Sequence, residues 1–188
     1  SWDFVHDQTE NGNSIRILSI LDEHTRECHG LRPRRSYRAQ DVINVLEELI
    51  AEHGAPACIR SDNGPEFIAY AIRDWLGERG IKTHYITPGS PWEQAYVESF
   101  HDKLRDELLN REIFANLSES GTMLESWRNE YNDERPHSSL DYLTPNEYAR
   151  ATAPAEPNEI PYVEVGGFVC SSGTSALLTQ TKKKRTNT

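Results

Sequence analysis

The stretch from Ala57 to Phe67 constrains the fold more than any other part of the chain. Its first three residues, 57–59, are apolar and typical of a short buried strand. Asp62 follows, and then Asn63-Gly64, two residues that tolerate the positive φ of a tight turn. Pro65 suits the first position of a helix, where a backbone N–H is not needed. The sequence therefore predicts a strand, a sharp turn and a helix, with the Asp62 carboxylate at the end of the strand.

Two further acids stand in segments that could present them to the same site. Glu98 follows Asp62 after 35 intervening residues and lies in a segment with apolar residues at helical spacing. Asp3 lies in Trp2–Val5, which we expect to form the first strand. Asp7 is an alternative, because residues four apart on a strand point to the same side. The Trp-Asp-Phe context favours Asp3, and we interpret Asp7 as a flanking residue.

The order of the expected elements indicates an α/β fold. Three strands come first and form a meander, and the later strands alternate with helices, which permits parallel pairing. We therefore predict an RNase H-like fold, a mixed five-stranded sheet flanked by helices. The strands are expected at 2–5, 15–21, 27–31 (ended by Pro33), 57–59 and 82–86, and the helices from Ser36 as N-cap to Gly54, at 65–79, at about 93–110 and at 118–131.

The composition limits the classes of protein to which the chain can belong. The chain has 188 residues and a mean hydropathy of −0.72, with no apolar run near the roughly 20 residues that cross a bilayer. We expect no membrane association and a cytoplasmic location, close to the nucleoid. The three cysteines, Cys28, Cys58 and Cys170, are scattered, which favours free thiols over a disulfide or a zinc site.

The two parts of the chain differ in character. Residues 1–150 are predicted to form one domain of ordinary size. Residues 151–188 are predicted to form a linker and a weakly ordered basic tail, in which 162–165 could add an edge strand. The first part holds 27 Asp and Glu against 16 Lys and Arg. Such an acidic surface is awkward for binding a polyanion, although a site for divalent metal must concentrate carboxylates.

These motifs together resemble the catalytic core of DDE transposases and retroviral-type integrases, most closely the transposases of the IS3 insertion-sequence family. The resemblance covers about residues 1–150. It rests on the three acids, on Leu21–Cys28, on Pro88-Gly89-Ser90-Pro91-Trp92-Glu93, and on Tyr131-Asn132 followed by Arg135-Pro136-His137. It implies an enzyme that cleaves DNA at the ends of an element and joins them to target DNA. It also implies at least a dimer on DNA.

The resemblance assigns the acids to metal binding. Asp3, Asp62 and Glu98 would hold two Mg²⁺ or Mn²⁺ ions, with Asp3 shared by both. Carboxylates are the ligands that hard divalent ions prefer, and paired ions serve phosphodiester chemistry. Asp22 and Glu23 form a second acidic pair, which we interpret as a surface pair at a strand end.

The same resemblance gives candidate DNA contacts. Arg105 lies seven residues after Glu98, and two helical turns bring it to the same face, although a surface ion pair with Asp102 or Asp106 is the alternative. Trp92 could stack on an unpaired base, or pack beneath its loop. The full set of DNA-binding candidates is Asn63, Trp92, Lys103, Arg105, Arg135 and His137; for Arg135 and His137 a structural or DNA-positioning role is preferred. Family members commonly have Asn-Gly where this chain has Gln94-Ala95, which puts the mobility of that loop in doubt.

Two other functions are compatible with the sequence. IS3-type transposases carry a helix-turn-helix module before the catalytic domain, and the chain begins almost at Asp3. A truncated or domesticated remnant that binds a partner or DNA without catalysis is therefore the main alternative. A nuclease for RNA–DNA hybrids would share the fold and metals, but the 35-residue spacing and the Arg135-Pro136-His137 stretch favour a transposase.

Overall fold

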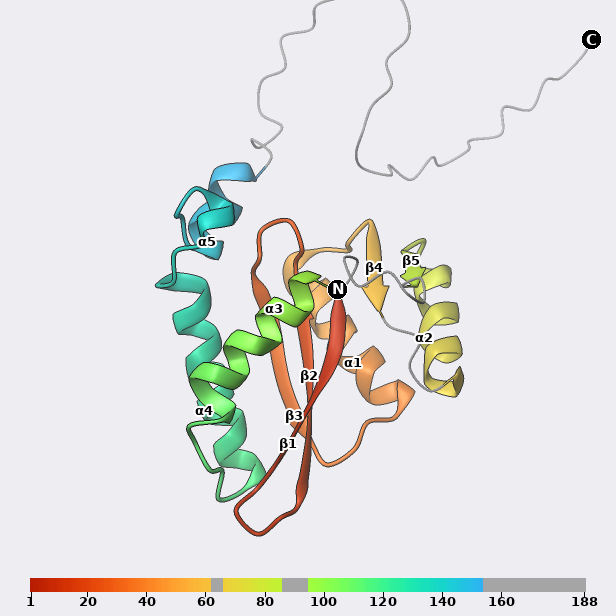
Figure 1. The fold of residues 1–188 in the computed structure, drawn as a ribbon. Coiled ribbons are helices and arrows are strands. Elements are labelled where there is room, and N and C mark those ends of the chain that lie inside the picture. Colours follow the sequence, from red (N-terminus) through yellow and green to blue (C-terminus); the bar gives the residue numbers. More distant parts are fainter. Residues whose placement is uncertain (62–65, 86–94, 154–188) are drawn as a thin grey trace, which may run out of the picture. The chain divides into compact units, whose positions relative to one another are not determined.

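A three-stranded antiparallel sheet opens the structure. The computed structural model describes residues 1–61, 66–85 and 95–153, and within them β1 (Trp2–Gln8), β2 (Ser14–Leu21) and β3 (Cys28–Arg34) form the sheet in chain order (Figure 1). Asp3 lies opposite Ser19 in this register. The predicted meander is confirmed.

Pro33 does not end the third strand as the sequence suggested. It lies inside β3 and pairs in register with Ile17 of β2. β3 is the last strand of its three-stranded sheet, so its outer edge has no strand beside it among the described residues. An edge strand accommodates proline, because the N–H that proline lacks can be the one that would face outward.

The remaining two strands form a separate parallel pair. β4 (Cys58–Ser61) pairs with β5 (Lys82–Tyr85), and Cys58 lies opposite Lys82. The predicted single five-stranded sheet is therefore wrong: the described residues form one sheet of three strands and one of two. β4 approaches β1. Strands of four residues offer few hydrogen bonds, so a small offset between β1 and β4 is enough to lose the ladder.

Helices follow the predicted order with shifted ends. The first begins after Arg38 instead of Ser36, because the Asp41 Oδ2 accepts the Arg38 backbone N–H at 2.8 Å, and it ends before Gly54, whose φ is 86°. The helices are α1 (Ala39–His53), α2 (Glu66–Glu78), α3 (Ala95–Leu104), α4 (Leu117–Asp133) and α5 (Pro145–Thr152), with a 3₁₀ turn at Ser138–Leu140.

The helix that carries Glu98 changes its winding where a continuous helix was expected. α3 passes directly into a π-helical turn, Arg105–Leu109, in which the Asn110 N–H donates to the Arg105 carbonyl at 2.8 Å. A π turn inserts one extra residue and shifts all later side chains around the helix. As a result Leu108 and Leu109 are both buried.

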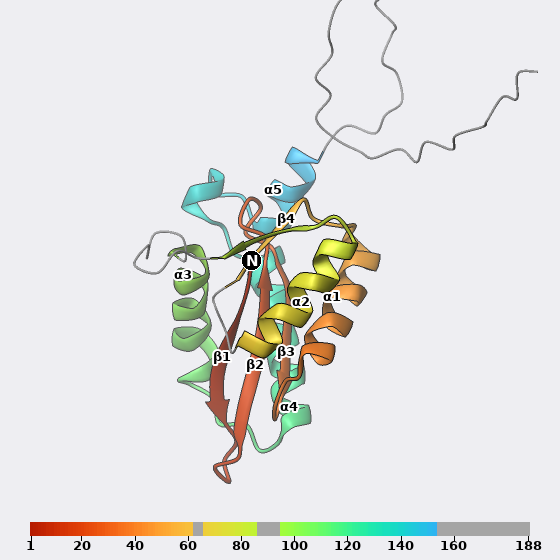
Figure 2. The same cartoon turned by 90° about the vertical axis from the view of Figure 1, so that its right-hand side faces the viewer.

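Apolar side chains fill both faces of the three-stranded sheet. One cluster joins Val5 and Ile17 to Phe100 of α3 and Trp127 of α4. The other joins residues such as Leu18 to α1 and α2. Figure 2 shows α3 on one side of the strands and α1 with α2 on the other. Helices on both faces are what the apolar central strand β2 requires, since its side chains point alternately to each side.

A buried asparagine fixes α4 against the edge strand. The Asn132 side chain accepts the Cys28 N–H and donates to the Cys28 carbonyl, both at 2.9 Å. Both groups belong to the sheet edge, where backbone polar groups need a partner. This pair of bonds holds the Tyr131-Asn132 segment in place beside β3.

The segment after the core is largely outside the described residues. The described residues up to Ala153 belong to one compact unit, Ser1–Ala153. The predicted linker and basic tail at 151–188, with its optional strand, lie almost wholly in that undescribed part. No helix among the described residues is long and apolar enough to cross a membrane.

Candidate active site

Asp3 is the second residue of β1, and its carboxylate is partly accessible. Its Oδ1 accepts the N–H of the next residue, Phe4, at 2.7 Å. Its Oδ2 lies 3.7 Å from Nδ1 of His101, and the Asp3 side chain is 27% exposed. A carboxylate that is fixed on a strand and still reachable is suited to binding a ligand.

His101 connects the helix of Glu98 to the strand of Asp3. Its Nε2 lies 2.8 Å from the Ser19 Oγ, and that hydroxyl donates to the Asp3 carbonyl at 3.0 Å. The direction of the Nε2–Ser19 Oγ hydrogen bond depends on which ring nitrogen of His101 carries the proton. Burial, followed by the charge of Arg105, lowers the pKa of His101 to about 4.

Glu98 lies in the first turn of α3 and is exposed. His101 follows it by three residues, so the two lie on neighbouring positions of one helix face. Through His101, α3 contacts the strand that carries Asp3. Asp62 lies outside the described residues, although Ser61, which precedes it, is buried as the last residue of β4.

The alternative acid, Asp7, lies farther along the same strand. Its Oδ1 accepts the Gln8 N–H at 2.7 Å, and its buried Oδ2 has no hydrogen-bond partner among the described residues. Four residues of strand place it about 13 Å from Asp3. It lies near the end of β1, where Thr9 pairs with Phe114, and this separates it from the first turn of α3.

Two DNA-binding candidates lie on the same helix with different exposure. Arg105 is exposed, and it takes part in none of the ion pairs found within the described residues; the Arg105–Asp102 and Arg105–Asp106 pairs are absent from them. Lys103 is half-buried, and burial together with the neighbouring Arg135 lowers its pKa. The guanidinium of Arg105 is thus the better placed of the two for a phosphate.

Within the Arg135-Pro136-His137 stretch, His137 is buried, Arg135 is half-buried and Pro136 is exposed. Arg135 forms a close ion pair with Glu107 and a longer one of 3.8 Å with Glu130. His137 is 7% exposed and packs edge-on against Tyr131, with ring centroids 5.0 Å apart. These contacts favour a supporting role. Asn63 and Trp92, the other two candidates, lie outside the described residues.

Comparison with known proteins places this geometry in a family. Two profiles described as "Integrase core domain" match the sequence, one at residues 1–91 and one at 79–145. Together they include Asp3, Asp62 and Glu98. Residues 1–145 form an integrase core domain.

Curated relatives of this integrase core come from bacterial insertion elements. An uncharacterized 31.7 kDa protein of insertion element IS407 from Burkholderia multivorans is 37% identical over 82% of the chain and 57% of its own length. An uncharacterized 39.2 kDa protein of IS476 from Xanthomonas euvesicatoria is also 37% identical, over 79% and 43%. The transposase of IS904 from Lactococcus lactis is 29% identical over 79% of the chain. The chain spans about half the length of these relatives.

Solved structures confirm the RNase H-like class of fold. An integrase chain of the simian T-cell lymphotropic virus intasome, in complex with PP2A regulatory subunit B56 gamma, superposes with a TM-score of 0.63 at 17% identity, over 88% of this chain and 59% of that one. The HTLV-2 integrase catalytic core in complex with magnesium gives 0.59 at 16%, over 78% and 92%. At these identities the likeness concerns the fold alone.

The integrase core was expected to bind metal, and its described residues offer only part of a site. Within 1–61, 66–85 and 95–153, no group of three His, Cys, Asp or Glu is gathered closely enough to hold an ion. Asp62 lies outside these described residues. The carboxylates of Asp3 and Glu98 are oxygen donors of the kind that Mg²⁺ and Mn²⁺ accept, so the donor chemistry fits.

The sequence reasoning missed two residues of this region. His101 carries a readable signal, since it lies three residues after Glu98 and so shares its helix face. Arg26 carries none: its guanidinium lies 3.5 Å above the ring of Tyr96 in the first turn of α3, and its backbone has φ 64°. Only the packed turn between β2 and β3 places it there.

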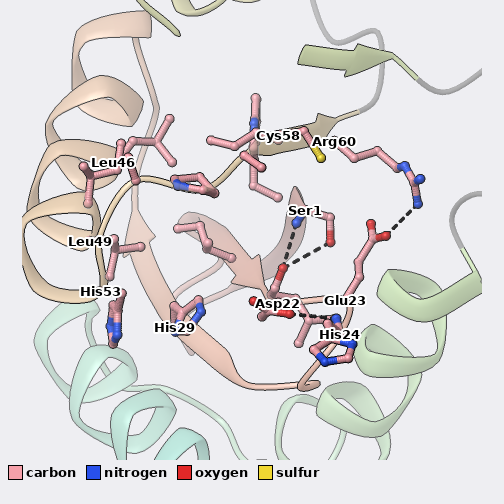
Figure 3. A pocket seen from close by; sticks show the side chains of 18 of the residues that line it. Ser1, Asp22, Glu23, His24, His29, Leu46, Leu49, His53, Cys58 and Arg60 are labelled. Carbon is pink, nitrogen blue, oxygen red and sulfur yellow. Dashed lines mark hydrogen bonds and ion pairs between the residues drawn. The ribbon is translucent and has the colours of Figure 1, made fainter. Parts of the chain in front are cut away.

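A pocket of about 490 Å³ opens elsewhere on the integrase core (Figure 3). Leu46 and Leu49 of α1 form an apolar wall, and the Glu23–Arg60 ion pair of 2.6 Å stands at one side. The rings of His29 and His53 are 4.3 Å apart. Among the described residues, the lining of the pocket includes Asp22 and Glu23 but neither Asp3 nor Glu98.

We expect acid to destabilise the integrase core through His137. Burial, with Lys103 and Arg135 nearby, lowers the pKa of His137 to about 4 from an ordinary 6.5, against the opposing charge of Glu107. The unfolded chain therefore takes up a proton that the folded chain refuses between these two values. The free energy of unfolding should be unaffected above pH 6.5 and should decrease as pH falls toward 4.

Urea unfolding at several pH values between 4.5 and 7.5 measures this effect. His137→Gln should make the curve of unfolding free energy against pH less steep over that window, whatever it does to stability at pH 7.5. A slope identical to that of the wild type would contradict the assignment.

Proposed function

We propose that the chain is the catalytic domain of an IS3-type DDE transposase. It cleaves DNA at the ends of an insertion element and transfers the resulting 3′-hydroxyl to target DNA. The observation that carries this proposal is the integrase core match over 1–145, together with the way α3 brings the Glu98 helix onto Asp3 through His101.

The proposed site combines three carboxylates on three elements. Asp3 on β1, Asp62 directly after β4 and Glu98 on α3 would hold two divalent ions. Bound ions activate the attacking oxygen and stabilise the leaving oxygen of a phosphodiester. The protein's part would be to fix the carboxylates: Phe4 N–H holds one oxygen of Asp3, and α3 would present Glu98.

DNA would approach along the exposed side of α3. Arg105, exposed and outside every ion pair of the described residues, is the side chain best suited to a backbone phosphate. Lys103, Asn63 and Trp92 would add contacts, whereas Arg135 and His137 position the end of α4. A homo-oligomer on paired DNA ends is part of the proposal.

A pre-joined branched DNA tests the chemistry without needing a recognition module. The same acids catalyse the reverse of strand transfer, so a branched duplex that imitates the joined product should be resolved to a labelled strand of defined length. We expect resolution with Mg²⁺ or Mn²⁺ and none in excess EDTA. Cleavage of an RNA–DNA hybrid without any resolution would indicate the hybrid nuclease. Metal binding by a folded chain without either product would favour the non-catalytic remnant.

A further inference from the structure

Basic side chains gather at one end of the three-stranded sheet, on the face that packs against α1. His6, Arg16 and Arg34 lie directly opposite one another on β1, β2 and β3. Side chains two residues apart on a strand share a face, so His6 lies on the face of Phe4, which packs against the apolar cluster of α1. Asp3 lies three residues before His6 and points to the other face of the sheet.

This row sets two guanidinium groups beside each other. Arg16 and Arg34 form a direct cross-strand pair, an arrangement in which like charges destabilise a sheet. Within the described residues, Arg34 has one ion pair, at 2.7 Å with Asp41, and Arg16 has none. The buried Nε of Arg16 also lacks a hydrogen-bond partner there. An anion that contacts both side chains would offset their repulsion.

Aromatic rings hold both guanidinium groups in place. The Cζ of Arg16 lies 3.7 Å from the centroid of the Phe4 ring, and the Cζ of Arg34 lies 5.7 Å from that of Tyr37. The Phe4 and Tyr37 rings are themselves 5.1 Å apart. A planar guanidinium over a ring keeps the N–H groups at its edge for hydrogen bonds, and its fork of donors matches the oxygens of a phosphate.

Two more arginines extend the row beyond β3. Nη1 of Arg35 donates to the backbone carbonyls of Asn13 and Ser14, both at 3.0 Å, which fixes this side chain beside the β1–β2 turn. Arg38, just before α1, is exposed and has no ion pair within the described part of the chain. The four residues Arg16, Arg34, Arg35 and Arg38 are called the sheet-end patch below.

We propose that the sheet-end patch binds the phosphate backbone of duplex DNA, on the face of the sheet opposite that of Asp3. That the anion is DNA rests on the proposed function. The chain has a formal net charge of −10, so a local group of four guanidiniums paired with a single carboxylate gives a polyanion a place to bind. Contacts to phosphates carry no sequence information, so the patch would hold DNA of any sequence and leave the choice of reacting strand to the candidate active site.

Salt dependence of DNA binding tests the patch without an activity assay. Fluorescence anisotropy measures how tightly the full chain binds a labelled duplex of arbitrary sequence, in EDTA and over a series of salt concentrations. The slope of log affinity against log salt should fall by about 1 per lost contact, and by about 3 in the variant Arg16→Gln/Arg34→Gln/Arg35→Gln. Its affinity at low salt should fall by about tenfold or more.

Arg73→Gln is the matched control. Arg73 is 46% exposed and pairs with Asp74 at 3.2 Å, whereas Arg34 is 48% exposed and pairs with Asp41 at 2.7 Å. Arg34→Gln alone should therefore lower both slope and affinity, and Arg73→Gln should leave both unchanged. Equal losses in these two variants would show that net charge matters and that the patch does not.

A second measurement uses only the wild type, so poor folding of a variant does not protect the proposal. Phenylglyoxal modifies accessible arginines, and mass spectrometry locates the products. Duplex DNA should slow modification of Arg34 and Arg35 several-fold and leave Arg73 unaffected. Equal rates with and without DNA would overturn the proposal.

The remaining outcomes are also decisive. A wild type that binds no duplex overturns the proposal, as do patch variants that bind duplex as the wild type does. Patch variants that change the sedimentation of the protein, but not its DNA binding, would make the patch an interface between copies of this chain. Resolution of branched DNA without protection of Arg34 and Arg35 would refute only the patch. Protection without resolution would refute only the proposed catalytic function.

Discussion

Asp62→Asn and Glu98→Gln are each expected to slow resolution of branched DNA by about a thousandfold or more. Both substitutions keep the size of the side chain and remove the charge that holds a divalent ion. Loss of an ion that contributes several kcal/mol to the transition state corresponds to at least that factor. Asp3→Asn should have the same effect, because its carboxylate is proposed to contact both ions.

Asp7→Asn is the matched control for this prediction. Asp7 lies on the same strand and the same face as Asp3, about 13 Å away, so its substitution should change the rate by only a few-fold. Rates are measured under single-turnover conditions with saturating Mg²⁺, and calorimetry checks metal binding. A large loss in Asp7→Asn together with an active Asp3→Asn would reverse the assignment of the strand acid.

Trp127→Ala is expected to lower the free energy of unfolding by about 3–5 kcal/mol. The Trp127 indole is 6% exposed, stacks on Tyr131 with centroids 5.2 Å apart and meets Phe100 edge-on at 5.5 Å. Its Nε1 donates to Glu107 at 3.0 Å. Truncation would leave a cavity between α3 and α4 and remove the donor that Glu107 uses.

Chemical denaturation of three variants separates these contributions. Trp127→Phe keeps most of the apolar contact and loses the hydrogen bond, so it should cost less than Trp127→Ala. Ile113→Ala, at a side chain that is 77% exposed, should change stability by no more than about 0.5 kcal/mol. An equal loss in Trp127→Ala and Ile113→Ala would mean that the aromatic cluster does not hold the two helices together.

This cluster links stability to the candidate active site. Phe100 lies between Glu98 and His101 on α3, so whatever fixes Phe100 also fixes the helix that presents both. Trp127→Ala should therefore impair catalysis even at temperatures at which the protein remains folded. Asn132, which bonds both backbone groups of Cys28, holds the other side of α4 to the sheet in the same way.

Local patterns predicted the elements because local chemistry forms them. Helical spacing of apolar residues gave α1 and α4, and Gly54 and Gly80, with φ of 86° and 71°, lie just past the ends of α1 and α2. Short, largely apolar runs gave the first two strands. The predictions that were wrong concern positions whose structure depends on contacts with residues distant in sequence. Pro33 stays in β3 because that strand is an edge, and the π turn at Arg105–Leu109 forms because it buries two adjacent leucines.

By itself the sequence determined the order of strands and helices, the two faces of β2, and the spacing of Asp3, Asp62 and Glu98. The first two are properties of residues close together in the chain, where backbone geometry sets the pattern, and the spacing of the acids is read directly from the sequence. Only the tertiary structure decided that β4 and β5 pair apart from β1–β3, that Arg135 pairs with Glu107 and His137 is buried, and that His101 meets Asp3. His101 and Asp3 are far apart in sequence, and the packing of α3 against β1 brings them together, since buried apolar area on both elements fixes how the helix lies on the strand.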